Sequence, residues 1–212
     1  MTEYGKMTLE EYRDALASDS PTPGGGTAAA VALSQGAALT IMVCNLTEGK
    51  EKWKDGWAAA DKSRSVAEPL LDKGHSLAAL DAHAFDRVMA AYRLPKSTQD
   101  EVDTRNIAIE TETMGAARVP MDTAEAAYSL LETLPDLAAL GNANAVTDVG
   151  VAGLLVSAAC KGALFNVEIN INSLPEDDHY VRIMKRQMDE LRLKCRDTAR
   201  EIMHSVHDRM QQ

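Results

Sequence analysis

The sequence predicts an all-α fold, a single-domain helical bundle over residues 1–212 with two small-residue helices at its centre. Hydrophobic residues make up 45% of the chain but aromatic residues only 4%. This mixture suits packed helices better than strands, which favour β-branched and aromatic side chains. Two stretches, residues 27–46 and 149–170, are nearly uncharged and rich in small residues, which is typical of helices surrounded by other helices. No fixed repeat or low-complexity linker divides the chain, and its length is enough to bury a core.

A short helix is expected near the start of the chain. Thr8 can cap it, and Glu11 stands at the position that completes a capping box. Pro21 and Pro23 then stop helical structure ahead of the first central helix, over residues 27–46.

A long helical stretch follows up to residue 92. Its apolar residues, from position 66 onward, recur at mixed spacings of three and four, which is the periodicity of a helix with one buried face. Pro69 and Gly74 lie inside it, so we expect the helix to be kinked or interrupted there.

The second half of the chain is also read as helical. Ser97 or Thr98 caps the next helix, which we expect to break or begin anew at Pro120. Residues 165–172, at the end of the second central helix, alternate apolar and polar side chains and on pattern alone fit a strand. Because no partner strand is visible, helix is the favoured prediction there. Residues 178–210 form a charged amphipathic helix.

Composition excludes several classes of function. The net charge of −10 argues against nucleic-acid binding, which needs a basic face. Cys44, Cys160 and Cys195 are odd in number and widely spaced, and the five histidines form no metal-binding pattern, so we expect free thiols and no metal site. The amphipathic, charged N-terminus is unlike a signal peptide, and residues 27–44 read as a core helix rather than a membrane span. A cytoplasmic protein is expected.

Two stretches share an unusual design, because a polar turn feeds a small-residue helix in each. The first is PTPGGG, residues 21–26, and the second is GNANAVTD, residues 141–148. Close helix crossing alone would explain the small residues. Buried polar groups at helix ends, however, are costly unless they are bonded, and a polar ligand would satisfy them. The polar side chains concerned are Asn45, Asn142, Asn144, Asp148 and Asn166.

Asp81 is the candidate acid–base residue. It shares a helical face with Phe85, four residues on, and a carboxylate beside apolar surface has a raised pKa that suits proton transfer near neutral pH. An isolated Asp on a helix is more often a solvated surface residue, so the pattern alone leaves both readings open. Lys50 and Lys96 stand in basic clusters that can meet a carboxylate tail.

These motifs, taken in order, resemble the formiminotetrahydrofolate cyclodeaminase / methenyltetrahydrofolate cyclohydrolase family. The matching stretches run from Ser18 to about Leu174 and are SDSPTPGGGTAAA, GAALTIMVCNLTEGK, LDAHAFDRVMAAYRLPKSTQDE, GNANAVTDVGVA and GALFNVEININSL. The resemblance implies an all-helical homodimer with a folate site and neither a metal nor a nucleotide cofactor. It places the family's catalytic aspartate, within a DxxAF pattern, on Asp81.

The resemblance implies one activity first and leaves two alternatives. The first is methenyltetrahydrofolate cyclohydrolase, which hydrolyses 5,10-methenyltetrahydrofolate reversibly to 10-formyltetrahydrofolate with Asp81 as general base and acid. The alternatives are formiminotetrahydrofolate cyclodeaminase, which releases ammonia, and a non-catalytic folate-binding helical dimer. Lys50 and Lys96 are then expected to hold the glutamate tail of the substrate. The residues expected to line the folate cavity are Pro23, Gly24, Gly25, Gly26, Asn45, Phe85, Asn142, Asp148 and Asn166.

Overall fold

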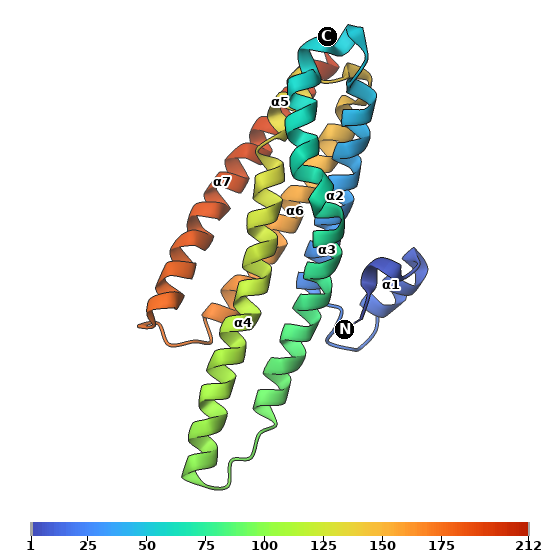
Figure 1. Ribbon diagram of the computed structural model, residues 1–212. Helices are drawn as coiled ribbons and strands as arrows, with labels where there is room; N and C mark the ends of the chain where they lie inside the picture. Colours follow the sequence, from blue (N-terminus) through green and yellow to red (C-terminus); the bar gives the residue numbers. More distant parts are fainter. Residues whose placement is uncertain (1, 212) are drawn as a thin grey trace.

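The computed structural model describes residues 2–211 as an all-α bundle without a strand in that range (Figure 1). Its α-helices are α1 (Leu9–Leu16), α2 (Gly25–Thr47), α3 (Trp57–Tyr92), α4 (Gln99–Leu131), α5 (Leu134–Leu140), α6 (Val146–Ile171) and α7 (His179–Met210). Short 3₁₀ turns occupy Tyr4–Lys6, Glu51–Gly56 and Ala143–Ala145. Helix was therefore the right choice for the end of the second central helix.

The two small-residue helices, α2 and α6, pack against each other at the centre, as predicted. Gly36 of α2 lies so close to α6 that a side chain there would collide with Val156. Gly162 of α6 faces Ala29 near the start of α2, so the two helices run antiparallel. Helices α3, α4 and α7 pack against this pair (Figure 1). Leu154, Phe165 and Ile169 of α6 stay exposed, so the pair is not enclosed on every side as the sequence predicted.

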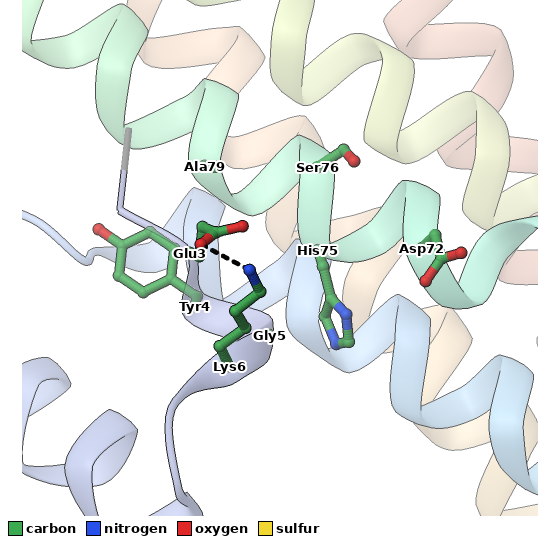
Figure 2. A pocket seen from close by; sticks show the side chains of 8 residues that line it. All are labelled: Glu3, Tyr4, Gly5, Lys6, Asp72, His75, Ser76 and Ala79. Carbon is green, nitrogen blue, oxygen red and sulfur yellow. Dashed lines mark hydrogen bonds and ion pairs between the residues drawn. The ribbon is translucent and has the colours of Figure 1, made fainter.

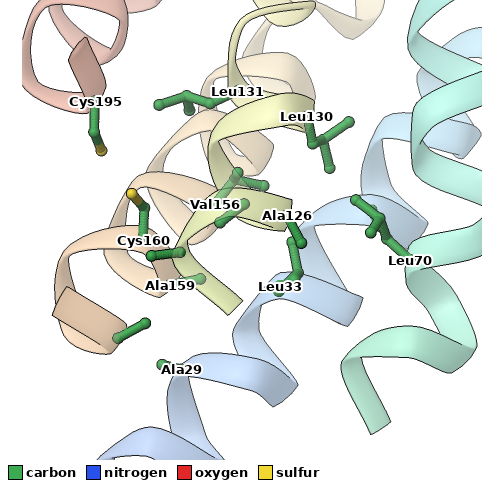
Figure 3. Close-up of a cluster of buried hydrophobic side chains, with 14 of the residues drawn as sticks. Ala29, Leu33, Leu70, Ala126, Leu130, Leu131, Val156, Ala159, Cys160 and Cys195 are labelled. Carbon is green, nitrogen blue, oxygen red and sulfur yellow. The ribbon is translucent and has the colours of Figure 1, made fainter. Parts of the chain in front are cut away.

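The core fills the space between these helices with aliphatic and small side chains (Figure 3). Leu33 of α2, Leu130 of α4 and Val156 of α6 are completely buried. Cys160 and Cys195 project into the same cluster, and all three cysteines are buried free thiols. These thiols serve packing, as the sequence predicted.

The helix interruptions predicted at Pro69, Gly74 and Pro120 are wrong. Helix α3 is continuous over 36 residues through Pro69 and Gly74, and α4 over 33 residues through Pro120. A Cβ at Gly74 would lie 2.8 Å from the Ala30 carbonyl oxygen of α2, so this glycine permits close packing of two helices. A proline inside a helix removes one hydrogen bond at a cost of about 3 kcal/mol, and burial along such long helices offsets that cost.

The local signals at the helix starts are confirmed. Thr8 with Glu11 and Thr98 with Glu101 both form complete capping boxes, and the Asp178 carboxylate caps α7. Helix α6 begins at Val146, three residues earlier than expected, because the 3₁₀ turn before it leads directly into the helix.

Candidate active site

The antiparallel pairing of α2 and α6 creates two polar ends, about 30 Å apart along the helices. At one end the turn Gly24–Gly26 lies beside Asn166, whose Nδ2 is 3.6 Å from the position of a Cβ on Gly25. We call this the glycine end. At the other end, the asparagine end, the backbone N–H of Asn142 donates to Oγ1 of Thr47 at 3.1 Å.

The glycine end contains a cavity of about 310 Å³. Helices α2, α3, α4 and α6 all contribute to its walls. The residues that line it are Pro21, Thr22, Gly24, Gly25, Gly26, Asp81, Phe85, Val88, Ala116, Asn166, Ile169 and Asn170. Five predicted binding residues, namely Gly24, Gly25, Gly26, Phe85 and Asn166, therefore meet Asp81 in one place.

Asp81 lies on α3 with its carboxylate against the first turn of α2. Its Oδ2 accepts a hydrogen bond from Oγ1 of Thr27 at 3.0 Å. Burial raises the pKa of Asp81 above its ordinary value, and the hydrogen bonds from the Thr27 side chain and backbone N–H oppose part of that rise. The result is a carboxyl group better matched than an exposed aspartate to taking and returning a proton near neutral pH.

The glycine turn is what allows this approach. A Cβ on Gly26 would overlap the Asp81 carboxylate, with Cγ only 2.7 Å away. Gly24 is the N-cap of α2 and has no side chain to cap the helix, while the Thr27 N–H bonds to Asp81. The backbone N–H groups of Gly25 and Gly26 stay available at the cavity wall. The turn thus begins a helix and exposes its backbone to a ligand at the same place.

Two tyrosines approach Asp81 from the N-terminal segment. The rings of Tyr4 and Tyr12 pack edge to face with centroids 6.1 Å apart. Burial raises the pKa of both hydroxyls, and the negative charge of Asp81 adds to that rise. The hydroxyl groups of Tyr4 and Tyr12 therefore lie close enough to Asp81 for its negative charge to disfavour their ionisation.

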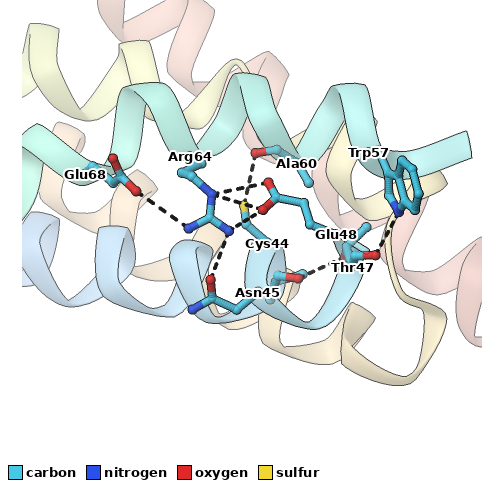
Figure 4. A network of polar contacts seen from close by, with 9 residues as sticks. Cys44, Asn45, Thr47, Glu48, Trp57, Ala60, Arg64 and Glu68 are labelled. Carbon is cyan, nitrogen blue, oxygen red and sulfur yellow. Dashed lines mark hydrogen bonds and ion pairs between the residues drawn. The ribbon is translucent and has the colours of Figure 1, made fainter. Parts of the chain in front are cut away.

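The asparagine end does not share this cavity, so the prediction that Asn45, Asn142 and Asp148 line it is wrong within one chain. Figure 4 shows the network around Asn45, where Oδ1 accepts from Nη2 of Arg64 at 2.9 Å. The Arg64 guanidinium also pairs with the Glu48 carboxylate at 2.6 Å. These groups bond to one another, and the antiparallel packing keeps them a full helix length from Asp81.

Three further predicted residues lie outside the cavity lining. Lys50 is exposed at the asparagine end, directly after α2, which is too far from Asp81 to hold the tail of a bound substrate in the same chain. Lys96 is exposed in the loop that joins α3 to α4. Pro23 follows a cis peptide bond and is buried, and it is not among the residues that line the cavity.

A second cavity, of about 430 Å³, lies where the N-terminal segment meets α3 (Figure 2). Lys6 pairs with Glu3 there at 2.9 Å, and Nε2 of His75 lies 3.3 Å from Oγ of Ser34. Although this cavity is larger, its charged groups already have partners or face solvent. Asp81, the carboxylate with a raised pKa, belongs to the smaller cavity.

Sequence reasoning missed several residues of the site. Thr27 follows the glycine turn directly, but nothing in the pattern pairs it with an aspartate 54 positions away. Asn170 lines the cavity and also donates to the Ala116 carbonyl of α4 at 2.9 Å. Its spacing of four residues from Asn166 places both on one face of α6, and this signal was available.

Comparison with known proteins assigns the family. The sequence profile of the Formiminotransferase-cyclodeaminase family matches residues 8–190, most of the chain. The chain belongs to this family. Members of the family process folates, as cyclohydrolases or as cyclodeaminases.

Two relatives and one solved structure support the assignment. A methenyltetrahydrofolate cyclohydrolase from Methylorubrum extorquens is 38% identical over 172 residues, which cover 81% of this chain and 83% of that protein. A formimidoyltransferase-cyclodeaminase from Rattus norvegicus is 30% identical over 209 residues, 95% of this chain but only 37% of that longer protein. A formiminotetrahydrofolate cyclodeaminase structure from Thermotoga maritima has a TM-score of 0.84 at 28% identity and covers 97% of this chain and 98% of its own. This family member therefore shares the fold of that cyclodeaminase over nearly its whole length.

Among residues 2–211, no group of three His, Cys, Asp or Glu side chains is placed to hold a metal ion. Asp81 is the one carboxylate among the residues that line the cavity of the glycine end.

Proposed function

We propose that the protein is a homodimeric methenyltetrahydrofolate cyclohydrolase, which interconverts 5,10-methenyltetrahydrofolate and 10-formyltetrahydrofolate. The observation that carries the proposal is the Asp81 carboxylate, held against the glycine turn in a cavity of about 310 Å³ with a raised pKa. The cyclohydrolase of Methylorubrum extorquens, which this chain matches over most of both lengths, supports the choice of reaction.

The substrate brings its own electrophile. The methenyl carbon lies between two nitrogens that share a positive charge, so water can attack it once a base removes a proton. Asp81 takes that proton as the C–O bond forms and becomes a neutral carboxylic acid. An ionised Asp81 also favours the cationic substrate over a neutral one at the start of the reaction.

The second half of the reaction returns the proton. The carbinolamine loses the proton of its hydroxyl group to solvent while the bond between carbon and N5 breaks. N5 receives the proton from the Asp81 carboxylic acid, which regenerates the carboxylate and gives 10-formyltetrahydrofolate. One water is consumed and one proton is released overall.

The remaining cavity residues orient the ring system. Backbone N–H groups of the glycine turn and the amide of Asn166 offer hydrogen bonds, and Phe85 offers an apolar wall. Holding the methenyl carbon within reach of Asp81 and a water is the positioning contribution to the rate.

A cyclodeaminase is the alternative, favoured by the likeness to the Thermotoga maritima structure. In that reaction N10 attacks the formimino carbon and ammonia departs, and a proton-transferring carboxylate serves both steps. Asp81 therefore supports either chemistry, and only an assay with each substrate separates them.

The test is the absorbance decay of 5,10-methenyltetrahydrofolate, in a buffer where spontaneous hydrolysis is slow. We expect rapid decay with the wild type and a loss of about 10²–10⁴-fold for Asp81→Asn, the range for removal of a general base. Asp86→Asn is the matched control, because Asp86 is an exposed carboxylate of the same helix outside the cavity lining.

Three other results would change the proposal. Fast decay that Asp81→Asn leaves intact would keep the reaction and remove Asp81 from the mechanism. No decay above background, with ammonia release from formiminotetrahydrofolate, would assign the cyclodeaminase. Tight folate binding without turnover of either substrate would leave a binding protein.

A further inference from the structure

Thr27 is buried at the glycine end and bonds to Asp81 through two different groups. Its side chain is completely buried, and Oγ1 donates to Oδ2 of Asp81 at 3.0 Å. Its backbone N–H also bonds to the Asp81 carboxylate. Thr27 is not among the residues that line the cavity, so its hydroxyl acts on a bound substrate only through Asp81.

The bond from the backbone follows from the missing cap of α2. Gly24 is the N-cap of this helix and has no side chain to accept from its first turn. The N–H of Ala28 donates to the Gly24 carbonyl at 2.9 Å, which leaves the N–H of Thr27, at the third helical position, without a partner inside α2. An N-cap side chain normally accepts from this position. Asp81 therefore takes the place of the N-cap from the neighbouring helix α3.

These two bonds hold the carboxylate without saturating it. A carboxylate offers about four acceptor positions, of which Thr27 occupies two. The other positions are left for water and substrate in the cavity that Asp81 lines. Both donors belong to the first turn of α2, so the orientation of the carboxylate is set before a substrate binds. Fixed orientation of a reacting group is the positioning contribution to a rate.

No charged side chain takes over this task in the described chain. Asp81 is the single ionisable residue of the cavity lining, and the neighbouring wall of α6 contributes amides. Tyr4 and Tyr12 approach from the N-terminal segment as neutral phenols, because burial raises their pKa values. The nearby ionisable groups of α3 are exposed or bonded elsewhere: Asp86 is exposed, His83 bonds to Arg87 at 3.0 Å, and Arg87 pairs with Glu112 of α4 at 2.8 Å.

We infer that Thr27 is the positioning residue of Asp81, and that its two donors hold the carboxylate in the orientation that proton transfer from water and to N5 requires. This step rests on the proposed function, in which Asp81 is the general base and acid. Both donors bind the ionised carboxylate more strongly than the neutral acid. They therefore counter the burial that raises the pKa of Asp81, and they favour return of the proton in the second half of the reaction.

The pH dependence of kcat/KM separates this role from a merely structural one. Thr27→Val keeps the shape of the side chain but removes the hydroxyl, so the pKa of Asp81 should rise and the acid limb of the profile should move to higher pH. At neutral pH we expect kcat for 5,10-methenyltetrahydrofolate to fall about 10-fold, the effect of one hydrogen bond to a charged group. KM should stay near the wild-type value, because Thr27 does not line the cavity.

Two further variants show whether the hydroxyl is responsible. Thr27→Ser retains the donor, and we expect it to restore the acid limb and most of kcat. Thr40→Val is the matched control, because Thr40 is another completely buried threonine of α2, whose Oγ1 donates to the Gly36 carbonyl at 2.9 Å. It should leave the profile unchanged. A Thr27→Ser variant as impaired as Thr27→Val, or an equal displacement of the profile by Thr40→Val, would overturn the inference.

A carbon-13 NMR titration of labelled aspartate carboxyl groups tests the same bonds without turnover. The Asp81 resonance is assigned by its loss in Asp81→Asn. Its titration midpoint should move to higher pH in Thr27→Val and return in Thr27→Ser, and an unchanged midpoint in Thr27→Val would contradict the inference. Thr27→Ala replaces the valine variant if that variant does not fold. A wild type without cyclohydrolase turnover would count against the proposed function instead, while the titration still decides whether Thr27 controls the ionisation of Asp81.

Discussion

The two ends of the α2–α6 pair look alike in sequence but differ in structure. In each, a Gly- or Asn-bearing turn begins one small-residue helix beside the asparagine-bearing end of the other. At the asparagine end the polar groups bond to one another, with Nδ2 of Asn142 donating to the Leu46 carbonyl at 2.8 Å and Arg64 joining Asn45 to Glu48. At the glycine end a cavity separates them, and Thr27 is the hydrogen-bond partner of Asp81.

This contrast gives a criterion for telling a structural joint from a site. A buried polar group costs free energy unless it is bonded, so a cluster whose members satisfy one another stabilises the fold. A cluster that leaves donors and a desolvated carboxylate around a cavity retains capacity for a ligand. By this criterion a substitution at the glycine end should change turnover, and one at the asparagine end should change stability.

Gly26→Ala is the strongest test of the glycine end after Asp81 itself. The new Cβ would overlap the Asp81 carboxylate and force it away from the first turn of α2. Because displacement of a catalytic group by about 1 Å can cost on the order of 100-fold, we expect kcat to fall roughly 10- to 100-fold. Steady-state hydrolysis of 5,10-methenyltetrahydrofolate measures it.

Gly115→Ala provides the matched control for that substitution. A Cβ at Gly115 in α4 would meet only the Arg87 guanidinium, at an ordinary contact distance of 3.5 Å. We expect unchanged turnover and a gain of up to about 1 kcal/mol in the free energy of unfolding, from better helix propensity. Equal losses of rate in both variants would show that Gly26 has no special relation to Asp81.

The fold was predictable because its signals are local or periodic. The capping boxes at Thr8 and Thr98 each depend on four neighbouring residues, and the small-residue composition of α2 and α6 marks them as central. The breaks expected at Pro69 and Pro120 failed for the opposite reason. Whether a helix tolerates a proline depends on burial along its whole length, which a local pattern does not contain.

The site was predictable only in part. Asp81 was identified through a family resemblance, and the glycine turn through its backbone chemistry. Asn45 was grouped with the turn although both belong to one helix, in which 20 residues separate them by about 30 Å. Which ends of two helices meet is a property of the tertiary packing, so the sequence could not show that Asn166 lies at the start of α2 and Asn142 at its end.

Thr47→Val should sharpen the contrast from the asparagine end. Oγ1 of Thr47 is fully buried, donates to the Val43 carbonyl at 2.8 Å and accepts the N–H of Asn142. Valine has the same shape but leaves that N–H unbonded, so we expect a loss of about 1–3 kcal/mol in the free energy of unfolding. Urea denaturation measures the loss, while kcat per folded molecule should stay at the wild-type value.

Thr111→Val is the control for this pair of measurements. Thr111 is an exposed residue of α4, and the change should stay within about 0.5 kcal/mol. A Thr47→Val variant with the wild-type free energy of unfolding would mean that the hydrogen bonds of the Thr47 hydroxyl contribute nothing measurable to stability.

The smallest expected effect links the site back to stability. Burial raises the pKa of Asp81 above the value of 3.8 that applies to the unfolded chain. The unfolded state therefore loses this proton at lower pH than the native state, and the native state is destabilised as pH rises from 3.8 through the raised value.

Asp81→Asn removes the ionisation and keeps an oxygen that accepts from Thr27. Its free energy of unfolding, relative to the wild type, should therefore rise from pH 4 to pH 7, by urea denaturation at both values. Asp86→Asn, at an exposed position, should show no such rise. If the wild type is at least as stable as Asp81→Asn at pH 7, the ionised carboxylate does not lower the free energy of unfolding. The polar groups of the glycine end would then stabilise the fold, as those of the asparagine end do.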